Sequence, residues 1–306
     1  MTTLPLTFSK EVADARASGA PLVALESTII THGMPYPQNT AFARQVEDDV
    51  RKAGAVPATI AVLEGRLHIG LEEAELTQLA QASGVAKLSR ADMAVCIAAG
   101  RTGATTVAAT MIAAHLAGIA VFATGGIGGV HKGAEQSFDI SADLMELAQT
   151  PVTVVAAGAK AILDVPKTLE VLETQGVPVI TLGQDSFPAF WSASSPYASP
   201  LRMETAAEVA RAHLLRAELD LPGGQLIANP IPAEAEIPLD QMTPVIERAQ
   251  ADAEQHGIAG KAVTPYLLQR IFELTEGRSL TANIALARNN ARMAARIAAE
   301  LATLVK

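Results

Sequence analysis

Short apolar runs of four to six residues alternate along the chain with longer stretches in which apolar positions recur every three or four residues. The short runs are typical of buried strands, and the longer stretches are typical of amphipathic helices. Strands are predicted at 22–25, 59–63, 67–69, 93–98, 120–123, 152–157, 177–181 and 226–228. Helices are predicted at 38–53, 72–82, 106–117, 141–148, 166–175 and 204–219, and the C-terminal stretch 240–306 is predicted to be helical. This order predicts a mixed or parallel sheet covered by helices on both faces.

Three connecting segments carry predictions of their own. Residues 64–66, Glu-Gly-Arg, separate two short strands and predict a hairpin. Ser279 or Thr281 is expected to cap the last helix. Residues 183–200 form a long loop rich in proline, serine and aromatic residues, including Trp191, the only tryptophan. Loops of this length are usually functional, so we expect a substrate lid, a segment packed over the core or a subunit interface.

Composition narrows the class of protein. The 306 residues show no internal repeat, low-complexity tail or clear linker, so we expect one domain over 1–306. A net charge of −9 argues against nucleic acid and anionic membranes as partners. No uncharged apolar run approaches the ~20 residues of a membrane span, and early charges interrupt any secretory signal. The single cysteine, Cys96, lies in an apolar run and is expected to be buried. These features suit a cytoplasmic protein.

Candidate chemistry gathers where predicted strands end, which is where α/β proteins bind ligands. The strand at 120–123 runs into Thr124-Gly125-Gly126-Ile127-Gly128-Gly129, and such a loop can present backbone N–H groups to phosphate. Lys160 follows the strand at 152–157 and could act as an amine nucleophile. Glu26 directly follows the strand at 22–25 and could be a general acid or base. The structural alternatives are a connecting turn, a solvated lysine and a carboxylate that accepts hydroxyl or backbone donors.

Two further clusters are candidates. Lys87 and Arg90 could together bind a phosphate group, or could belong to a solvated loop before a strand. Ser141 can cap the helix that follows it, and that helix N-terminus could also bind phosphate. Asp139 could hold Mg²⁺ or Mn²⁺, because one carboxylate with several waters suits these ions. The absence of HExxH and CxxC motifs argues against zinc, and the absence of GxSxG and GxxxxGK[ST] against hydrolase elbows and P-loops.

Six segments together resemble the pseudouridine-5′-phosphate glycosidase family, which includes the indigoidine-synthase-A-like proteins. They are ALESTIITHGMPYPQN (24–39), TTVAATMIAAHLAGIAVFATGGIGGVH (105–131), FDISADL (138–144), VTVVAAGAKAILDVPKTLE (152–170), ANPIP (228–232) and TPYLLQRIFELTEGRSLTANIALARNNA (264–291). The resemblance covers about residues 8 to 303. It implies a three-layer α/β/α sandwich with a central mixed, largely parallel sheet and a helical C-terminal region. It also implies a homotrimer with one Mn²⁺ per subunit, replaceable by another divalent cation.

The implied activity is reversible cleavage of the C–C glycosidic bond of pseudouridine 5′-phosphate, a step of pseudouridine catabolism that gives uracil and ribose 5-phosphate. Carbon is a poor leaving group, and the family uses a lysine imine on the ring-opened ribose as an electron sink. By motif position, Lys160 would be the nucleophile and Glu26 the acid that protonates the uracil carbon, while Asp139 would bind Mn²⁺ largely through waters. Asn283 would read the uracil edge. The full set of expected substrate contacts is Lys87, Val107, Ser141, Ala142, Asp143, Asn283, Thr124, Gly125, Gly126 and His131.

Two other functions are compatible with such residues. One is a non-catalytic phosphosugar- or nucleotide-binding accessory protein, which would bind ligand without turnover. The other is an imine-forming sugar-phosphate aldolase, which would ignore uracil. The combination of Glu26, Lys87, Asp139 and Lys160 argues against the accessory role. The chain departs from the family at Ala287 and Arg288, which replace bulkier apolar residues and are expected to affect helix packing.

Overall fold

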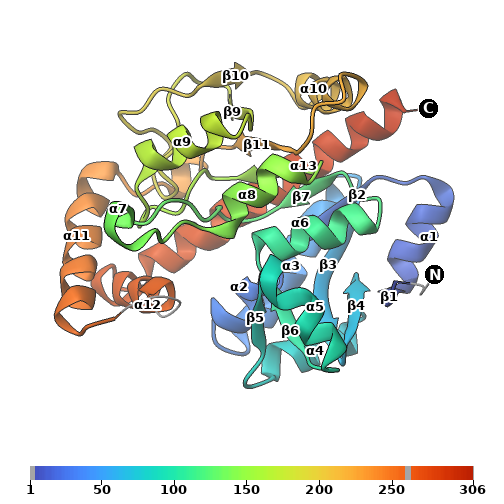
Figure 1. The fold of residues 1–306 in the computed structure, drawn as a ribbon, viewed down its shortest axis with the longest axis horizontal. Helices are drawn as coiled ribbons and strands as arrows, with labels where there is room; N and C mark the ends of the chain where they lie inside the picture. Colours follow the sequence, from blue (N-terminus) through green and yellow to red (C-terminus); the bar gives the residue numbers. More distant parts are fainter. Residues whose placement is uncertain (1–3, 259–262, 306) are drawn as a thin grey trace.

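A sheet of eleven strands forms the centre of the molecule (Figure 1). The computed structural model describes residues 4–258 and 263–305. Within them the strands are β1 (Leu6–Phe8), β2 (Leu22–Leu25), β3 (Val56–Leu63), β4 (Arg66–Ile69), β5 (Ala86–Leu88), β6 (Gly103–Thr105), β7 (Val121–Ala123), β8 (Thr153–Ala156), β9 (Val179–Leu182), β10 (Leu201–Met203) and β11 (Gln225–Ala228). Their order is β1-β4-β3-β2-β7-β8-β11-β9-β10, and β6 pairs with both β3 and β5. Among these strands of the described residues, only the β3–β4 and β3–β6 pairs are antiparallel, so the predicted mixed, largely parallel sheet is confirmed.

Helices flank this sheet. They are α1 (Lys10–Ser18), α2 (Thr28–His32), α3 (Gln38–Lys52), α4 (Glu73–Gln81), α5 (Arg90–Ala98), α6 (Val107–Leu116), α7 (Ala134–Ser137), α8 (Ala142–Gln149), α9 (Val165–Thr174), α10 (Ala206–Glu218), α11 (Leu239–Gln255), α12 (Val263–Leu274) and α13 (Arg278–Leu304), with a 3₁₀ turn η1 (Ala233–Ala235). The long α13 crosses the molecule diagonally behind α8 (Figure 1) and packs against α3, α10, β2, β7 and β8. Among the described residues no helix has the length and apolar character needed to cross a bilayer.

Local capping explains where several helices begin. Thr106 accepts a hydrogen bond from the Ala109 N–H at 3.4 Å and starts α6. The Ser141 hydroxyl accepts from the Asp143 N–H at 3.2 Å, so the predicted cap of α8 is confirmed. Side-chain acceptors at these positions satisfy N–H groups that have no partner within the helix. Thr106 directly follows β6, so its cap also fixes the point at which the chain leaves that strand.

Two local predictions are wrong. Residues 93–98 form part of α5 and not a strand, because Ser89 and Asp92 form a capping box that starts a helix. Within it Met93 and Cys96 are buried while Val95 is 60% exposed, which is the helical period. Cys96 is buried as expected. The last helix is capped by Gly277 at a φ of 85°, and Ser279 and Thr281 lie inside α13.

The long loop at 183–200 packs over the core. Its aromatic side chains Phe187, Phe190 and Trp191 are buried in the main hydrophobic cluster. The loop is closed by a hydrogen bond from the Phe187 N–H to the Tyr197 carbonyl, at 2.9 Å. Of the three interpretations of this loop, packing over the core describes Phe187, Phe190 and Trp191, whereas Tyr197 is 38% exposed; the lid and the subunit interface stay predictions.

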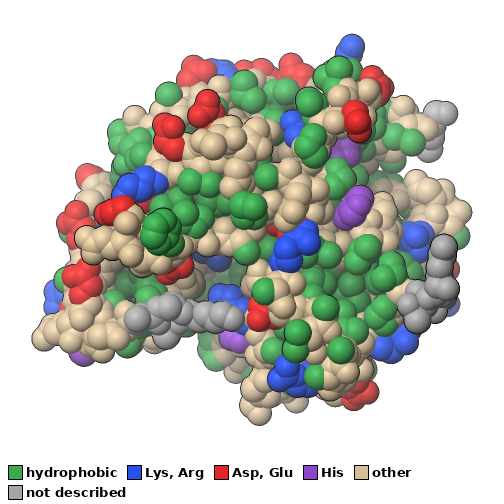
Figure 2. All heavy atoms as spheres, viewed as in Figure 1, with side chains coloured by type: hydrophobic (Ala, Val, Ile, Leu, Met, Phe, Trp, Pro, Cys, Tyr) green, Lys and Arg blue, Asp and Glu red, His purple; other side chains and the backbone are tan. Residues whose placement is uncertain are grey.

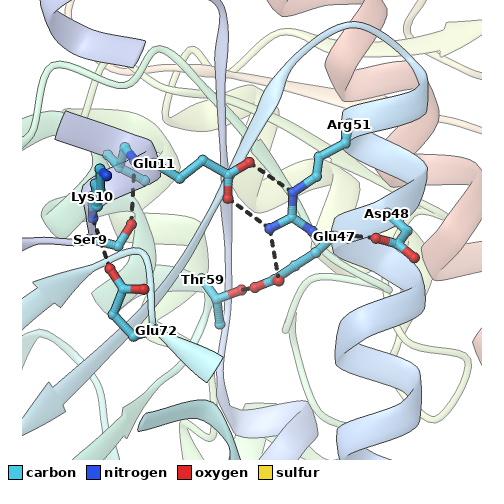
Figure 3. Close-up of polar contacts among 9 residues, drawn as sticks. Ser9, Lys10, Glu11, Glu47, Asp48, Arg51, Thr59 and Glu72 are labelled. Carbon is cyan, nitrogen blue, oxygen red and sulfur yellow. Dashed lines mark hydrogen bonds and ion pairs between the residues drawn. The ribbon is translucent and has the colours of Figure 1, made fainter. Parts of the chain in front are cut away.

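A polar network ties α1 and α3 to β3 (Figure 3). Arg51 donates to both carboxylate oxygens of Glu11 at 2.8 Å and approaches Glu47 at 3.4 Å. The Thr59 hydroxyl donates to Glu47 at 2.6 Å. Burial raises the pKa of the Glu47 carboxyl, and the bonds from Thr59 and Arg51 oppose this effect. This network holds α3 against β3. The neighbouring strand, β2, ends directly before Glu26.

Candidate active site

A cavity of about 390 Å³ opens where the carboxyl ends of β2, β7 and β8 meet α12 and α13. Figure 2 shows the surface hollowed between the side of the molecule that carries α12 and the side that carries β5. The predicted site residues that line this cavity are Glu26, Lys87, Gly125, Gly126, Lys160 and Asn283. Parallel strands place their carboxyl ends at one edge of a sheet, which explains why residues far apart in sequence meet here.

Glu26 is held by two hydroxyl donors. Thr28 Oγ1 donates to one carboxylate oxygen and Thr124 Oγ1 to the other. Thr28 begins α2 just after β2, and Thr124 follows β7, the strand beside β2. Because both oxygens are engaged, the carboxyl group has a fixed orientation at the wall of the cavity.

Lys160 reaches the cavity because the segment after β8 pairs with the glycine loop. The Ile127 N–H donates to the Gly158 carbonyl at 3.1 Å, and the Lys160 N–H donates to the Ile127 carbonyl at 3.1 Å. Gly158 permits this path with a φ of 86°, in the left-handed region. No carboxylate of the described residues forms an ion pair with Lys160, whereas Lys167 on α9 pairs with both Glu135 and Asp164. The amine of Lys160 is therefore not engaged by a carboxylate in this part of the chain.

The glycine loop is shaped by close packing. A Cβ added at Gly126 would lie 2.6 Å from the Phe190 ring. A Cβ added at Gly128 would lie 2.2 Å from the Ser141 hydroxyl and 2.8 Å from the Asp143 carboxylate. These distances are far below van der Waals contact, so both positions require glycine whatever the loop binds.

Asp143 is buried, and its carboxylate links two segments of the backbone. Its Oδ1 accepts from the Ala108 N–H at 3.0 Å, and its Oδ2 accepts from the Gly128 N–H at 2.8 Å. It thereby ties the start of α6, beside the buried Val107, to the glycine loop. Val107, Ser141, Ala142 and Asp143 do not line the 390 Å³ cavity, so their predicted substrate contacts stay predictions.

Asp139 lies in the connection between α7 and α8, outside the lining of the cavity. Its backbone carbonyl accepts from the His131 N–H at 3.0 Å, which places these two predicted site residues together. The described residues hold no group of three His, Cys, Asp or Glu side chains suited to a metal ion. One carboxylate leaves most coordination positions to water or substrate oxygens, a donor set that fits Mn²⁺ or Mg²⁺ better than zinc.

Lys87 and Arg90 do not form a joint phosphate site. Lys87 lines the cavity from β5. Arg90 instead donates from Nε and Nη2 to the two carboxylate oxygens of Glu146 on α8, at 2.8 and 2.7 Å. The hypothesis of a two-cation cluster is wrong, because the second cation is committed to a buried carboxylate.

Three further residues matter for the cavity although no motif in the sequence marks them. His32 lines it from α2, and burial together with the charge of Lys87 lowers the pKa of its imidazole. Gln269 lines it from α12. Asn290 on α13 donates to the Thr124 carbonyl at 2.8 Å and fixes the loop that supports Glu26. The segments containing these residues carried the family resemblance, but their local pattern gave no indication of which side chains face the cavity.

Comparisons with known proteins agree over nearly the whole chain. The model of the family "Indigoidine synthase A like protein" matches residues 11–300. A pseudouridine-5′-phosphate glycosidase of Roseobacter denitrificans is 75% identical over 98% of this chain and 97% of its own. One of Jannaschia sp. is 70% identical over 98% of this chain and 100% of its own. The crystal structure of the prealnumycin C-glycosynthase AlnA in complex with ribulose 5-phosphate superposes with a TM-score of 0.92, at 38% identity, over 100% of this chain and 99% of that chain. The chain therefore belongs to the indigoidine synthase A-like family, together with relatives that are named pseudouridine-5′-phosphate glycosidase.

Proposed function

We propose that this enzyme cleaves the C–C glycosidic bond of pseudouridine 5′-phosphate and releases uracil and ribose 5-phosphate. The observation that carries the proposal is that Glu26 and Lys160, from the ends of β2 and β8, line one cavity. An acid and an amine are the two groups that this reaction requires. The names of relatives at 75% and 70% identity support the same substrate.

The proposed chemistry uses the two groups in sequence. The Lys160 amine bonds to C1′ as the C1′–O4′ bond opens, and a proton of that amine passes to O4′. Glu26 then delivers a proton to the uracil carbon. The nitrogen lone pair forms a C1′=N imine as the C1′–C bond breaks, so the bonding pair leaves with the protonated uracil. Water hydrolyses the imine, which restores the lysine and releases ribose 5-phosphate. The two hydroxyl donors on Glu26 would hold its carboxyl group toward the uracil carbon.

Several of the other predicted residues would bind the sugar phosphate. Lys87 supplies a cation at the cavity wall, and the neighbouring structure that holds ribulose 5-phosphate supports a pentose phosphate as ligand. We further propose that Asp139 binds one Mn²⁺ through waters, which would supply positive charge for the phosphate. Mn²⁺ titration followed by electron paramagnetic resonance would test this directly, and Asp139→Asn is expected to abolish the bound signal. Sedimentation would test the proposed homotrimer, and cell fractionation would test the cytoplasmic location.

The proposal is tested by incubating the protein with pseudouridine 5′-phosphate and identifying products by liquid chromatography and mass spectrometry, with Mn²⁺ and with chelator. We expect uracil and ribose 5-phosphate in equal amounts, lost on chelation and in Lys160→Ala. Lys167→Ala is the matched control, because Lys167 is paired with surface carboxylates. Binding without turnover would favour an accessory role, and turnover of other sugar phosphates with no use of uracil would favour an aldolase.

Bond formation is a second candidate for the working direction. The structural neighbour is named a C-glycosynthase, and the imine route is chemically reversible. Incubation with uracil and ribose 5-phosphate is expected to yield pseudouridine 5′-phosphate with the same dependence on Lys160. The ratio of the two rates at cellular concentrations would decide the direction.

A further inference from the structure

A buried hydrogen bond fixes one polar side chain of the cavity. The Trp191 indole Nε1–H donates to Asn283 Oδ1 at 2.7 Å. Trp191 is 1% exposed and packs edge-on against Phe190, with ring centroids 5.0 Å apart. Its backbone carbonyl also accepts from the Ile237 N–H at 2.9 Å. The indole is therefore buried and packed against Phe190, and the backbone that carries it is held by a further hydrogen bond.

This bond determines which way the Asn283 amide faces. The oxygen and nitrogen of an amide are usually hard to tell apart, and their assignment depends on the hydrogen-bond partners. An indole N–H is a donor only, so the atom that meets it must be the amide oxygen. The Asn283 NH₂ group then points away from Trp191, and no acceptor among the described residues bonds to it. Asn283 lines the 390 Å³ cavity, so this NH₂ group is available to a ligand.

We propose that Trp191 is a positioning residue that makes Asn283 a fixed hydrogen-bond donor toward a carbonyl oxygen of the nucleobase. The inference rests on the proposed function and adds the origin of its base selectivity. Uracil has a carbonyl at both C2 and C4. Cytosine carries an amino group at C4 and isocytosine carries one at C2. An amino group at the contacted position would face the Asn283 NH₂ donor to donor, which leaves both groups without an acceptor.

Two variants separate this role from simple packing. Trp191→Phe keeps an aromatic ring beside Phe190 but removes the donor that the described residues offer to Asn283 Oδ1. The amide can then rotate and accept from an amino group. Asn283→Asp keeps the bond from Trp191 but presents a second carboxylate oxygen to the cavity, which is an acceptor. A residue that merely fills space would not reverse the preferred base.

The experiment measures inhibition of pseudouridine 5′-phosphate cleavage by uracil, cytosine and isocytosine in the presence of ribose 5-phosphate. In the wild-type enzyme we expect uracil to bind at least tenfold more tightly than one of the amino bases. This ratio should fall at least fivefold in Trp191→Phe and should invert in Asn283→Asp. If Trp191→Phe does not fold, the inverted base preference of Asn283→Asp tests the proposal by itself.

A second readout does not depend on turnover. Trp191 is the only tryptophan, so ¹⁵N-indole labelling gives one resonance that reports its N–H. We expect slow hydrogen exchange in the wild type and faster exchange, with an upfield shift, in Asn283→Ala. An active wild-type enzyme with unchanged base ratios in both variants would overturn this inference alone. A wild-type enzyme that cleaves nothing would overturn the proposed function, and the inference with it.

Discussion

Replacing Asn290 by alanine is expected to weaken both the fold and the site, because this residue joins α13 to the loop below Glu26. Asn290 is 0% exposed. Its Nδ2 donates to the Thr124 carbonyl at 2.8 Å and to the Gly125 carbonyl at 3.3 Å, and its Oδ1 accepts from Asn229 at 3.0 Å. The Gly125 carbonyl keeps its bond from the Ala157 N–H in the variant. The Thr124 carbonyl and the Asn229 amide lose the partners that Asn290 gives them.

The magnitude follows from these two groups. A buried polar group left without its partner costs about 1–3 kcal/mol, so we expect a loss of about 4 kcal/mol in the free energy of unfolding. With an unfolding entropy of about 2.1 cal/mol/K per residue and 306 residues, this loss lowers Tm by about 6 °C. Thr124 also donates to Glu26, so kcat/KM should fall at temperatures at which the variant is still folded.

Asn289→Ala is the matched control for this prediction. Asn289 is the neighbouring residue on α13 and makes one partly buried bond, to the Pro230 carbonyl at 3.1 Å. One such bond is worth about 1 kcal/mol, and we expect a Tm loss below about 2 °C. Differential scanning calorimetry of both variants measures the contrast. Equal shifts for the two, or a change below 2 °C for Asn290→Ala, would refute the reasoning.

Three further predictions test other parts of the account. Burial raises the native pKa of Glu47 above its ordinary value of 4.5, so the carboxyl group ionises in the unfolded state first as pH rises. The wild-type protein should therefore lose stability relative to Glu47→Gln as pH rises from 4.5 to the native pKa. A Tm difference between the two proteins that is constant with pH would contradict this. Burial also raises the pKa of the Cys96 thiol, so the native protein should react slowly with a thiol reagent and the unfolded protein quickly; equal rates would place the thiol at the surface. Gly128→Ala should lower the free energy of unfolding by several kcal/mol, because the added Cβ would collide with Ser141 and Asp143. A normal yield and a normal Tm of this variant would show that the loop can move to accept the Cβ.

The hydrophobic pattern was sufficient for the long strands and helices but not for the short elements. The apolar run that forms β2 directly before Glu26 is clear. The hairpin at 64–66 is also clear, and the antiparallel β3–β4 pair confirms it. The run at 93–98 is apolar at both the helical and the strand period, and the capping residue Ser89 decides for a helix. The strands β1, β5, β6 and β10 have three residues each, too few for any period, whereas β7 is equally short but was predicted because it lies in the longer apolar run 120–123.

Some features of the candidate site could likewise be predicted from the sequence, and others could not. Glu26 and Lys160 could be predicted because they follow strands whose carboxyl ends share one edge of the sheet. The partners of Arg90 and Asn283 could not, because Glu146 lies 56 residues from Arg90 and Trp191 lies 92 residues from Asn283. Contacts of this separation depend on how the elements pack, which the local pattern does not encode.

The central claim, that Lys160 forms an imine with the sugar, is tested most directly by borohydride trapping. Incubation with ribose 5-phosphate condenses the sugar aldehyde with the amine and releases water, and hydride reduction makes the adduct permanent. Peptide mass spectrometry should then find the pentose phosphate on Lys160 in the wild type and not on the control residue Lys167. An adduct that persists in Lys160→Ala, or that lies on another lysine of the wild-type enzyme, would contradict the account.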